Sequence, residues 1–529
     1  MKHPVHASNS LVAPVDLVAR RLSVTAGWIA ERPRVAITLI SILYFAAALA
    51  LAHVKPFWND ELYTFYIARR PGMRGVWDAL LTGAEQVPPL FYAITKASIG
   101  IFGYTHIGMR LPEILGFWLM SLSLYGVALR FVSVPYAILA TVFPLLTEAF
   151  DYAYEARPYG LVLGFCGCAL WCWFEATGGS RRSLAVVGLA VSLAAALSCH
   201  YYAILAFLPL VAGEAVRSWQ RRRLDLPILI TFLVALAPLV VLFPLIRAGH
   251  SWTATFWAKP NLGSIMEFYR AALSPSELLL FAVPLALVVQ VLINSEIVGA
   301  SAGRSLISLS GLVTIVGFAL LPVVAVILGK TITHAYTSRY VLIAIIGLTS
   351  VLVWALSRLA SDGATPALLL IVLSVALFGV QSVQHYRDLV AWARDDEQTL
   401  RFLVDNAGGQ PVAIQDPHLF FELSALWNGR PGLTLVYLFD RDHALAYTKT
   451  DVVELGLMTL KSWAPLHMER FDDFVARKSP ILVYPPPPPP EPAIFRWLVR
   501  ELERDHWRFT VSAHNGEHPL FLAEPPVDR

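Results

Sequence analysis

Carboxylates gather in the stretch Trp58–Leu90, directly after the first long apolar run of the chain. Asp60 and Glu61 are adjacent, and Glu85 lies three residues before a proline pair. An ionised carboxylate is costly against lipid, so at this boundary it faces water, protein or a substrate. One that faces a substrate hydroxyl can act as its general base. The alternative is a solvated loop, with Glu61 in the first turn of a helix whose dipole favours an acid.

Cationic and aromatic residues occur at later boundaries of apolar runs. The candidates for contacts with a substrate are Arg157, Tyr159, His200, Arg339 and Tyr340. Arginine beside a carboxylate suits transfer of a group from a phosphate. The carboxylate accepts a proton from the acceptor, and the arginine stabilises the negative charge that develops on the leaving oxygen.

Plainer interpretations stay open for several residues. His200, beside two tyrosines, also fits a hydrogen-bonded residue at a helix interface, and His334 is similarly undecided. Arg110 is interpreted as an anchor for a helix at the lipid headgroups. Trp252 and Trp257 fit either an aromatic belt or a surface that stacks on a sugar ring.

The composition is typical of a polytopic membrane protein. Of the 529 residues, 56% are hydrophobic and only 15% are charged, with a mean hydropathy of +0.58, whereas about a quarter of a soluble domain is charged. The chain has no basic run with interleaved aromatic residues, so nucleic acid is not expected as a partner. The four cysteines lie in apolar runs without metal-binding spacing, so no disulfide framework or cysteine metal site is expected.

The sequence predicts about eleven transmembrane helices. The apolar runs are, to within a few residues, 35–53, 107–130, 133–150, 157–175, 183–200, 202–218, 226–246, 277–298, 305–329, 339–358 and 366–384. Arginines recur in the short loops on one side and in the N-terminal tail, and the positive-inside rule places that side in the cytoplasm. The first long loop, about residues 54–106, and the C-terminal region are then extracytoplasmic.

The chain divides into two predicted domains. Residues 1–384 form the transmembrane domain, whose first outer loop contains two stretches with helical spacing. From residue 385 charged residues become common, which predicts a soluble extracytoplasmic α/β domain at 385–529. Its expected strands are 411–416, 433–439, 479–485, 507–514 and 519–525, and its expected helices are 388–406, 417–427, 463–477 and 491–505. The six-proline tract Pro485–Pro490 predicts a rigid polyproline connector.

Six motifs in order resemble the GT-C superfamily of membrane glycosyltransferases. They read WNDE, EQVPPLFY, GMRLP, YEARPYG, CHYY and SRY, and each stands at the end of a predicted helix. The resemblance is strongest with bacterial family 39, the relatives of protein O-mannosyltransferases and aminoarabinose transferases. It covers residues 36–210 best and is thin over 210–384.

The resemblance implies transfer of a sugar from a polyprenyl-phosphate donor to an acceptor hydroxyl on a protein, lipid or glycan, at the outer face of the inner (cytoplasmic) membrane. By position Asp60 matches the family's general base, with Glu61 beside it and Glu85 at a third acidic position. Arg157 and Arg339 match cations that contact the donor phosphate.

Three further residues of these motifs are candidates for substrate contacts. Tyr159, His200 and Tyr340 lie in the same motifs and are predicted to bind substrate. Many family members have His or Lys where this chain has Val87, which puts a phosphate or metal contact there in doubt. The sequence therefore predicts no definite cofactor and leaves a divalent cation open.

Two other classes of function compete with the transferase. A lipid or sugar transporter would share the many helices and charges, but it should show repeats between its halves, and the long first loop has no counterpart later in the chain. A non-catalytic membrane subunit would not need the full set of acidic and basic residues. The sequence therefore favours the transferase.

Overall fold

The structure is a computed structural model and describes residues 12–250, 252, 257–273, 307–485, 497–516 and 518–526. Most of these residues lie in helices, and a six-stranded sheet forms near the C-terminus. The apolar run at 277–298 and most of the proline tract lie outside the described residues.

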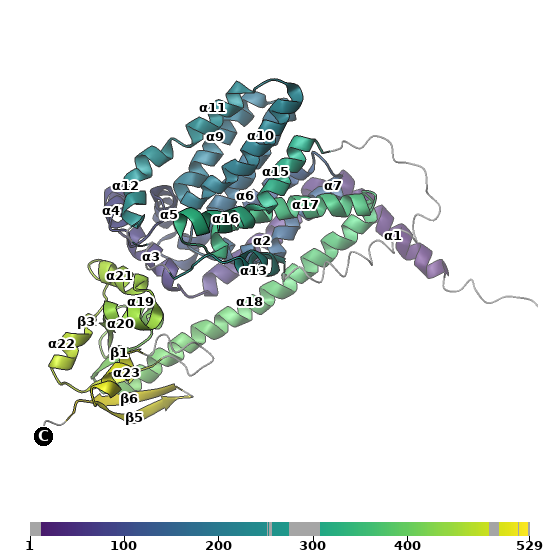
Figure 1. Cartoon of the computed structure of the whole chain (residues 1–529). Coiled ribbons are helices and arrows are strands. Elements are labelled where there is room, and N and C mark those ends of the chain that lie inside the picture. Colours follow the sequence, from purple (N-terminus) through teal and green to yellow (C-terminus); the bar gives the residue numbers. More distant parts are fainter. Residues whose placement is uncertain are drawn as a thin grey trace, which may run out of the picture.

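The helices before residue 364 form one bundle, drawn in purple to green in Figure 1. In chain order its elements are α1 (Val12–Glu31), α2 (Pro33–Val54), α3 (Asn59–Ala68), α4 (Gly72–Leu80), α5 (Pro89–Phe102), α6 (His106–Ala128), α7 (Val134–Val142), η1 (Phe143–Leu146), η2 (Glu148–Tyr154), α8 (Tyr159–Gly178), α9 (Arg182–Cys199), η3 (Tyr201–Ala206), α10 (Phe207–Arg221), α11 (Leu226–Ala235), α12 (Pro238–His250), α13 (Gly263–Leu273), α15 (Leu309–Ala319), α16 (Leu321–Leu328), η6 (Gly329–Thr333), η7 (Ser338–Val341) and α17 (Ala344–Leu359).

The number of membrane spans differs from the expected eleven. Among the described residues, six helices are long and apolar enough to cross a membrane, and two bent helix pairs raise this to at most eight. Helices α10 and α17 have only 15 and 16 residues, fewer than the ~20 that a bilayer usually needs. The count of eleven is therefore not confirmed.

Prolines stand where two predicted spans are broken. The segment of α7 and η1 meets η2 at an angle of 74°, and α15 meets the segment that begins with α16 at 54°. Pro322 stands in the first turn of α16, directly after the second break, and Pro144 stands in the first turn of η1, shortly before the first break. Proline is tolerated in a first turn, whereas deeper in a helix it lacks the backbone N–H that the helix needs and clashes with the preceding turn. The first break lays η2 against α2 and α6, at the end of the bundle that holds the first loop.

The first long loop folds into three helices, α3, α4 and α5. Asp60 and Glu61 stand in the first turn of α3, where the helix dipole favours acids. The helical spacing recognised in the sequence is thus confirmed on both sides of Glu85, which lies in the turn between α4 and α5.

One long helix joins the bundle to the C-terminal sheet. Helix α18 (Ala364–Ala407) has 44 residues and runs unbroken through the predicted domain boundary at 384/385. Figure 1 shows it leaving the bundle beside α17 and ending at the sheet. It packs against α1, α2 and α7 near one end and against α19, β1 and β5 near the other.

The C-terminal sheet has the strand order β3-β2-β1-β4-β6-β5. The first four strands in this order are parallel to one another. Strand β6 runs antiparallel to both of its neighbours, β4 and β5. The strands are β1 (Pro411–Ile414), β2 (Thr434–Phe439), β3 (Met468–Arg470), β4 (Ile481–Tyr484), β5 (Arg508–Asn515) and β6 (His518–Glu524), and the helices among them are α19 (Pro417–Trp427), α20 (Arg441–Thr448), α21 (Val452–Leu460), α22 (Phe471–Ala476) and α23 (Trp497–Arg504).

All five expected strands are confirmed, but one expected helix is wrong. The segment 463–477 contains the edge strand β3 followed by the short helix α22. The three residues of β3 carry no run of β-branched or aromatic side chains, so pairing with β2 rather than local propensity defines the strand. Helices α20 and α21 were not expected.

The sheet separates two apolar cores, because alternate residues of a strand face opposite sides. In β4, Leu482 packs with α18, α19 and α21, whereas Val483 packs with α22 and α23. The first of these cores also contains Leu62, Tyr63 and Tyr66 of α3, so the sheet domain and the first loop share buried apolar surface.

Candidate active site

Asp60 lies at the centre of a cluster of two acids and two arginines. Its Oδ2 atom is 2.6 Å from Arg339 Nη1 and 4.0 Å from Arg157 Nε. Arg157 Nη1 donates to the backbone oxygen of Asp60 at 3.0 Å and to Glu85 Oε2 at 2.5 Å. The fold therefore brings together four predicted site residues that are spread over 279 positions of the chain.

The arginines also set the charge of Asp60. Burial alone would raise the pKa of this carboxyl, but Arg339, Arg157 and His418 outweigh burial and hold the pKa below its ordinary value of 3.8. Asp60 is therefore ionised at neutral pH. Its side chain keeps 19% of its surface exposed, so a substrate can reach it.

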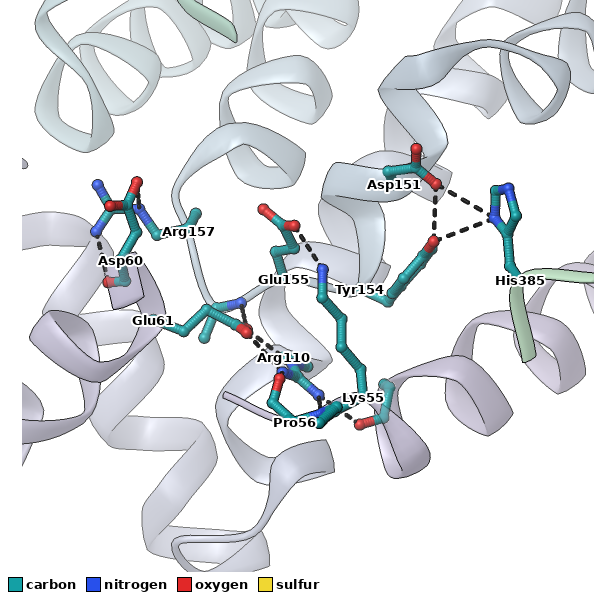
Figure 2. A network of polar contacts seen from close by, with 12 residues as sticks. Lys55, Pro56, Asp60, Glu61, Arg110, Asp151, Tyr154, Glu155, Arg157 and His385 are labelled. Atoms are coloured by element: carbon teal, nitrogen blue, oxygen red, sulfur yellow. Dashed lines mark hydrogen bonds and ion pairs between the residues drawn. The ribbon is translucent and has the colours of Figure 1, made fainter. Parts of the chain in front are cut away.

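Glu61 faces a different partner, as Figure 2 shows. It forms a forked pair with Arg110, with Nε to Oε1 at 2.7 Å and Nη2 to Oε2 at 2.6 Å, and Oε1 also accepts the Ala156 N–H at 2.6 Å. The other N–H groups of the guanidinium donate to the backbone oxygens of Ala52, Lys55 and Pro56. Both side chains of the pair are completely buried.

The interpretation of Arg110 as a headgroup anchor is wrong. A charge buried without a partner is strongly unfavourable. Glu61, the acid that follows Asp60 in the chain, is the buried partner of Arg110. Burial alone would raise the pKa of Glu61, but Arg110, Lys55 and the Ala156 N–H lower it below its ordinary value. Glu61 has no exposed surface at which a substrate could contact it.

A second buried pair continues this network away from Asp60. Lys55 Nζ lies 2.5 Å from Glu155 Oε1. The ammonium group also lies 5.2 Å from the ring centroid of Tyr154, whose hydroxyl donates to Asp151 at 2.7 Å. Figure 2 shows the chain of contacts ending at His385 of α18, 3.4 Å from Asp151. The network ties α2, α6, η2 and α18 together beside α3.

Three predicted substrate-binding residues, Tyr159, His200 and Tyr340, lie together near Arg157 and Arg339. The ring of His200 lies 5.5 Å from the rings of both Tyr159 and Tyr340, and Tyr340 stacks on Tyr202 at 4.3 Å. Burial, followed by the charges of Arg157 and Arg339, lowers the pKa of His200 to about 3. The imidazole is therefore neutral, and its Nδ1 accepts the Tyr202 N–H at 3.3 Å.

Several donors around Asp60 are buried and unsatisfied. Arg157 Nε, Arg339 Nε and Trp58 Nε1 have no hydrogen-bond partner among the described residues. An unpaired buried donor costs about 1–3 kcal/mol. The Arg339 guanidinium also lies 6.0 Å from the Trp58 ring. An anion at this position would satisfy donors that the folded chain leaves without partners.

The described residues contain no group of three or more His, Cys, Asp or Glu side chains that could hold a metal ion. The acids of the cluster are instead paired with arginines, so the charge that a cation would neutralise is already balanced by the protein.

The comparisons with known proteins begin with a family model. Residues 86–246 match the family described as dolichyl-phosphate-mannose-protein mannosyltransferase. This range contains Arg157, Tyr159 and His200 and begins directly after Glu85. Among curated protein sequences, none matches the chain.

Several solved structures resemble this one. ArnT from Cupriavidus metallidurans bound to undecaprenyl phosphate matches with a TM-score of 0.50 and 16% identity, covering 94% of this chain and 98% of that chain. The same protein in the apo state matches with a TM-score of 0.48 and 14% identity, covering 95% of this chain and 98% of that chain. The Archaeoglobus fulgidus oligosaccharyltransferase complex with Zn and sulfate matches with a TM-score of 0.39 and 10% identity, covering 84% of this chain and 68% of that chain.

The comparisons support a GT-C superfamily glycosyltransferase. The resemblance identified from the six sequence motifs is thereby confirmed, and the chain is a multi-pass membrane protein.

Sequence reasoning missed several polar residues around the site. Lys55 directly follows a long apolar helix, a position where a buried cation is unusual, so its partner could have been sought in the sequence. Glu422 and His418 gave no such signal. They lie in α19 and reach the first loop only because the C-terminal domain docks there, with Glu422 bonded to Asn59 across 363 residues.

Proposed function

We propose that the chain transfers a sugar from a polyprenyl-phosphate donor to an acceptor hydroxyl, with Asp60 as the general base. The observation that carries this proposal is the cluster of Asp60, Arg157 and Arg339. It combines an ionised, partly exposed carboxylate with two guanidinium groups, each of which keeps a buried, unpaired Nε–H.

The proposed reaction is a displacement at the anomeric carbon of the sugar. The acceptor oxygen forms the new bond to that carbon as the bond from carbon to phosphate oxygen breaks. The acceptor proton moves to Asp60, and the electron pair of the broken bond stays on the lipid phosphate. Arg157 and Arg339 stabilise the charge that develops on the phosphate.

The ion pair between Asp60 and Arg339 gives the donor a second role. A carboxylate held by two arginines is a weak base, because they stabilise its ionised form. A donor phosphate would compete with Asp60 for the same guanidinium groups. Its binding would thereby raise the basicity of Asp60 at the moment when the acceptor must be deprotonated.

The remaining predicted residues have supporting roles in this proposal. Glu85 holds Arg157 through its 2.5 Å contact and so keeps the guanidinium directed at Asp60. His200, being neutral, with Tyr159 and Tyr340, offers polar and aromatic contacts to a sugar without adding charge. Glu61 is assigned a structural role, because its pair with Arg110 is fully buried.

The proposal of a lipid donor has support from one fold relative, which was solved with undecaprenyl phosphate bound. We further propose that the protein lies in the inner (cytoplasmic) membrane with its N-terminus in the cytoplasm, and that residues 385–529 are an extracytoplasmic domain. Arginine-rich short loops support this orientation.

The orientation predicts that alkaline phosphatase fused after Arg529 is active and that a cytoplasmic fluorescent reporter fused there is dark. The reverse pattern would place the Asp60 cluster in the cytoplasm and would contradict both the orientation and the outer-face reaction.

A donor panel tests the reaction itself. The purified protein would be incubated with several polyprenyl-phosphate sugars and a mixture of membrane acceptors, and release of polyprenyl phosphate would be followed. At least one sugar should give release in the wild type and little in Asp60→Asn. If no donor is turned over, or if Asp60→Asn matches the wild type with the active donor, the proposal is wrong.

A further inference from the structure

The C-terminal domain packs along the full length of α3, the helix that carries Asp60. In the middle of α3, Tyr66 stacks on Phe421 of α19 at 5.8 Å, and Tyr63 meets the same ring edge-on at 5.5 Å. Beyond its C-terminal end, the Arg70 guanidinium lies 5.3 Å from the ring centroid of Trp463. Figure 1 shows α19 and α21 directly beneath α3.

This contact leaves no spare room. A Cβ atom placed on Gly456 of α21 would lie 1.9 Å from the hydroxyl oxygen of Tyr63 and 2.9 Å from the adjoining ring carbon. Tyr63 is 8% exposed and Phe421 is completely buried, so neither ring can swing aside into solvent. The position of α3 is therefore coupled to the position of the C-terminal domain.

The N-terminal end of α3 receives a hydrogen bond acceptor from the same domain. The first N–H groups of a helix have no partner within the helix and need a cap. Trp58, at the N-cap position, provides no side-chain oxygen. Glu422 of α19 provides one instead, because its Oε1 accepts the Asn59 N–H at 3.2 Å.

We propose that Glu422 is a positioning residue, which holds the first turn of α3, and with it the carboxylate of Asp60, in place for transfer. Asn59 directly precedes Asp60, so a change in this turn displaces the base. The inference rests on the proposed function of Asp60. A misplacement of about 1 Å at a reacting group can cost ~10²-fold in rate. Loss of a single helix cap is expected to lower the rate by less than this.

The surroundings of Glu422 favour its neutral form. Burial, then Asp396 of α18, Asp416 at the N-cap of α19 and Glu61 of α3, raise its pKa to about 8, while the Asn59 N–H opposes the rise. His418, on the same helix, is among the groups that lower the pKa of Asp60. At neutral pH a protonated Glu422 can still accept the Asn59 N–H through its carbonyl oxygen, without adding a negative charge beside Asp60.

The test compares Glu422→Ala, Glu422→Gln and the control Glu397→Ala. Gln keeps an oxygen that accepts the Asn59 N–H, whereas Ala removes it. Glu397 lies on the exposed face of α18, where it pairs with Arg401. We expect Glu422→Ala to lower kcat by about 2- to 30-fold with little change in donor KM, the range that corresponds to loss of one cap. Glu422→Gln and Glu397→Ala should stay within twofold of wild type.

Amide hydrogen exchange provides a measurement that does not depend on activity. In Glu422→Ala the peptide that contains Asn59 and Asp60 should exchange faster than in wild type, and in Glu422→Gln and Glu397→Ala it should not. Unchanged exchange in Glu422→Ala would overturn the inference. So would a fall in kcat that is equal in Glu422→Ala and Glu422→Gln, because only the alanine variant lacks the acceptor.

The two proposals fail in different ways. If Asp60→Asn is inactive and Glu422→Ala turns over like the wild type, Glu422 is not a positioning residue but the proposed function stands. If Asp60→Asn is fully active, the proposed function fails, and the exchange result alone then decides whether Glu422 caps α3.

The pH dependence of stability gives a further check. A carboxyl whose pKa rises from 4.5 to about 8 on folding destabilises the folded protein as pH increases between these values. The Tm of Glu422→Gln minus that of wild type should therefore increase from pH 5 to about 8 and be level above it. A difference that does not change with pH would contradict the buried, neutral state of Glu422.

Discussion

Asp60 and Glu61 are neighbours in one helical turn, yet they enter two unlike ion networks. Glu61 and Arg110 are fully buried, and their facing hydrogen-bonding atoms are used within the protein. Asp60 is partly exposed, and the arginines beside it keep unpaired N–H groups. The first network has no capacity for a ligand. The second can exchange partners, which is what a site for an anionic donor needs.

Helix geometry explains the separation. Successive residues of an α-helix point about 100° apart, so Asp60 turns toward Arg157 and Arg339 while Glu61 turns toward α6. The same turn of α3 therefore anchors the loop with one acid and presents the other. Loss of the Glu61 network should affect folding, and loss of the Asp60 network should affect chemistry.

The largest expected effect is on turnover. Asp60→Asn keeps the shape of the side chain and removes its basicity, so kcat should fall by about 10²–10⁴. Donor affinity should not fall, because Asn no longer competes with the phosphate for the arginines, and Tm should stay near wild type. Steady-state release of polyprenyl phosphate measures this. If Asp60→Asn stays active and Glu85→Gln is inactive, the cluster is the site but the base is Glu85.

The closed network should give a loss of stability instead. Arg110→Ala leaves the Glu61 charge buried without its partner, and breaking such a pair typically costs 3–5 kcal/mol. A clear fall in Tm of the detergent-solubilised protein is expected. Arg401→Ala is the matched control, since its pair with Glu397 is exposed and such i,i+4 pairs contribute only about 0.3–0.5 kcal/mol. Equal Tm values for the two variants would remove the distinction between the networks.

The arginines of the open network should affect donor binding. Arg157→Ala and Arg339→Ala each remove a charge-assisted contact worth roughly 1.5–3 kcal/mol, so donor affinity should fall by about ten- to a hundredfold. Arg339→Lys should recover only part, because a point charge replaces a planar fork. Titration with donor under conditions without turnover measures the affinity. Wild-type affinity in both alanine variants would exclude these residues from the donor site.

The smallest effect is on the pH profile. Arg339 lowers the pKa of Asp60 against the effect of burial, so Arg339→Ala should raise that pKa. Activity that needs an ionised Asp60 would then be lost at a higher pH as the solution is acidified. The midpoint of the acid limb of kcat/KM should lie at a higher pH in Arg339→Ala than in wild type. An acid limb that does not move would show that Arg339 and Asp60 are not coupled in the working enzyme.

The sequence allowed prediction of features that depend on local patterns. Two of the first-loop helices, α3 and α5, follow from helical spacing of apolar residues, and five of the six strands follow from short β-rich runs. The likeness of the site motifs to a known superfamily placed Asp60, Arg157 and Arg339 in one site, and the structure brings the three together.

Features that depend on tertiary contacts could not be predicted in this way. Whether Arg110 faces lipid or Glu61 is decided by where the fold places the first turn of α3 relative to α6. The strand β3 exists because β2 pairs with it. The hydrogen bond from Asn59 to Glu422 joins residues 363 positions apart and leaves no local trace in either segment.

The unbroken helix α18 also has a consequence for how this chain can change length. A stretch of 44 helical residues measures about 66 Å, and each residue added or removed rotates whatever follows by about 100° and shifts it by ~1.5 Å. A single insertion between the bundle and the sheet would therefore carry α19 around the axis of α18 and away from α3. Insertions of about 18 residues, five whole turns, restore the rotation but move the domain by ~27 Å. The length of α18 is thus fixed in both angle and distance by the two ends that it connects.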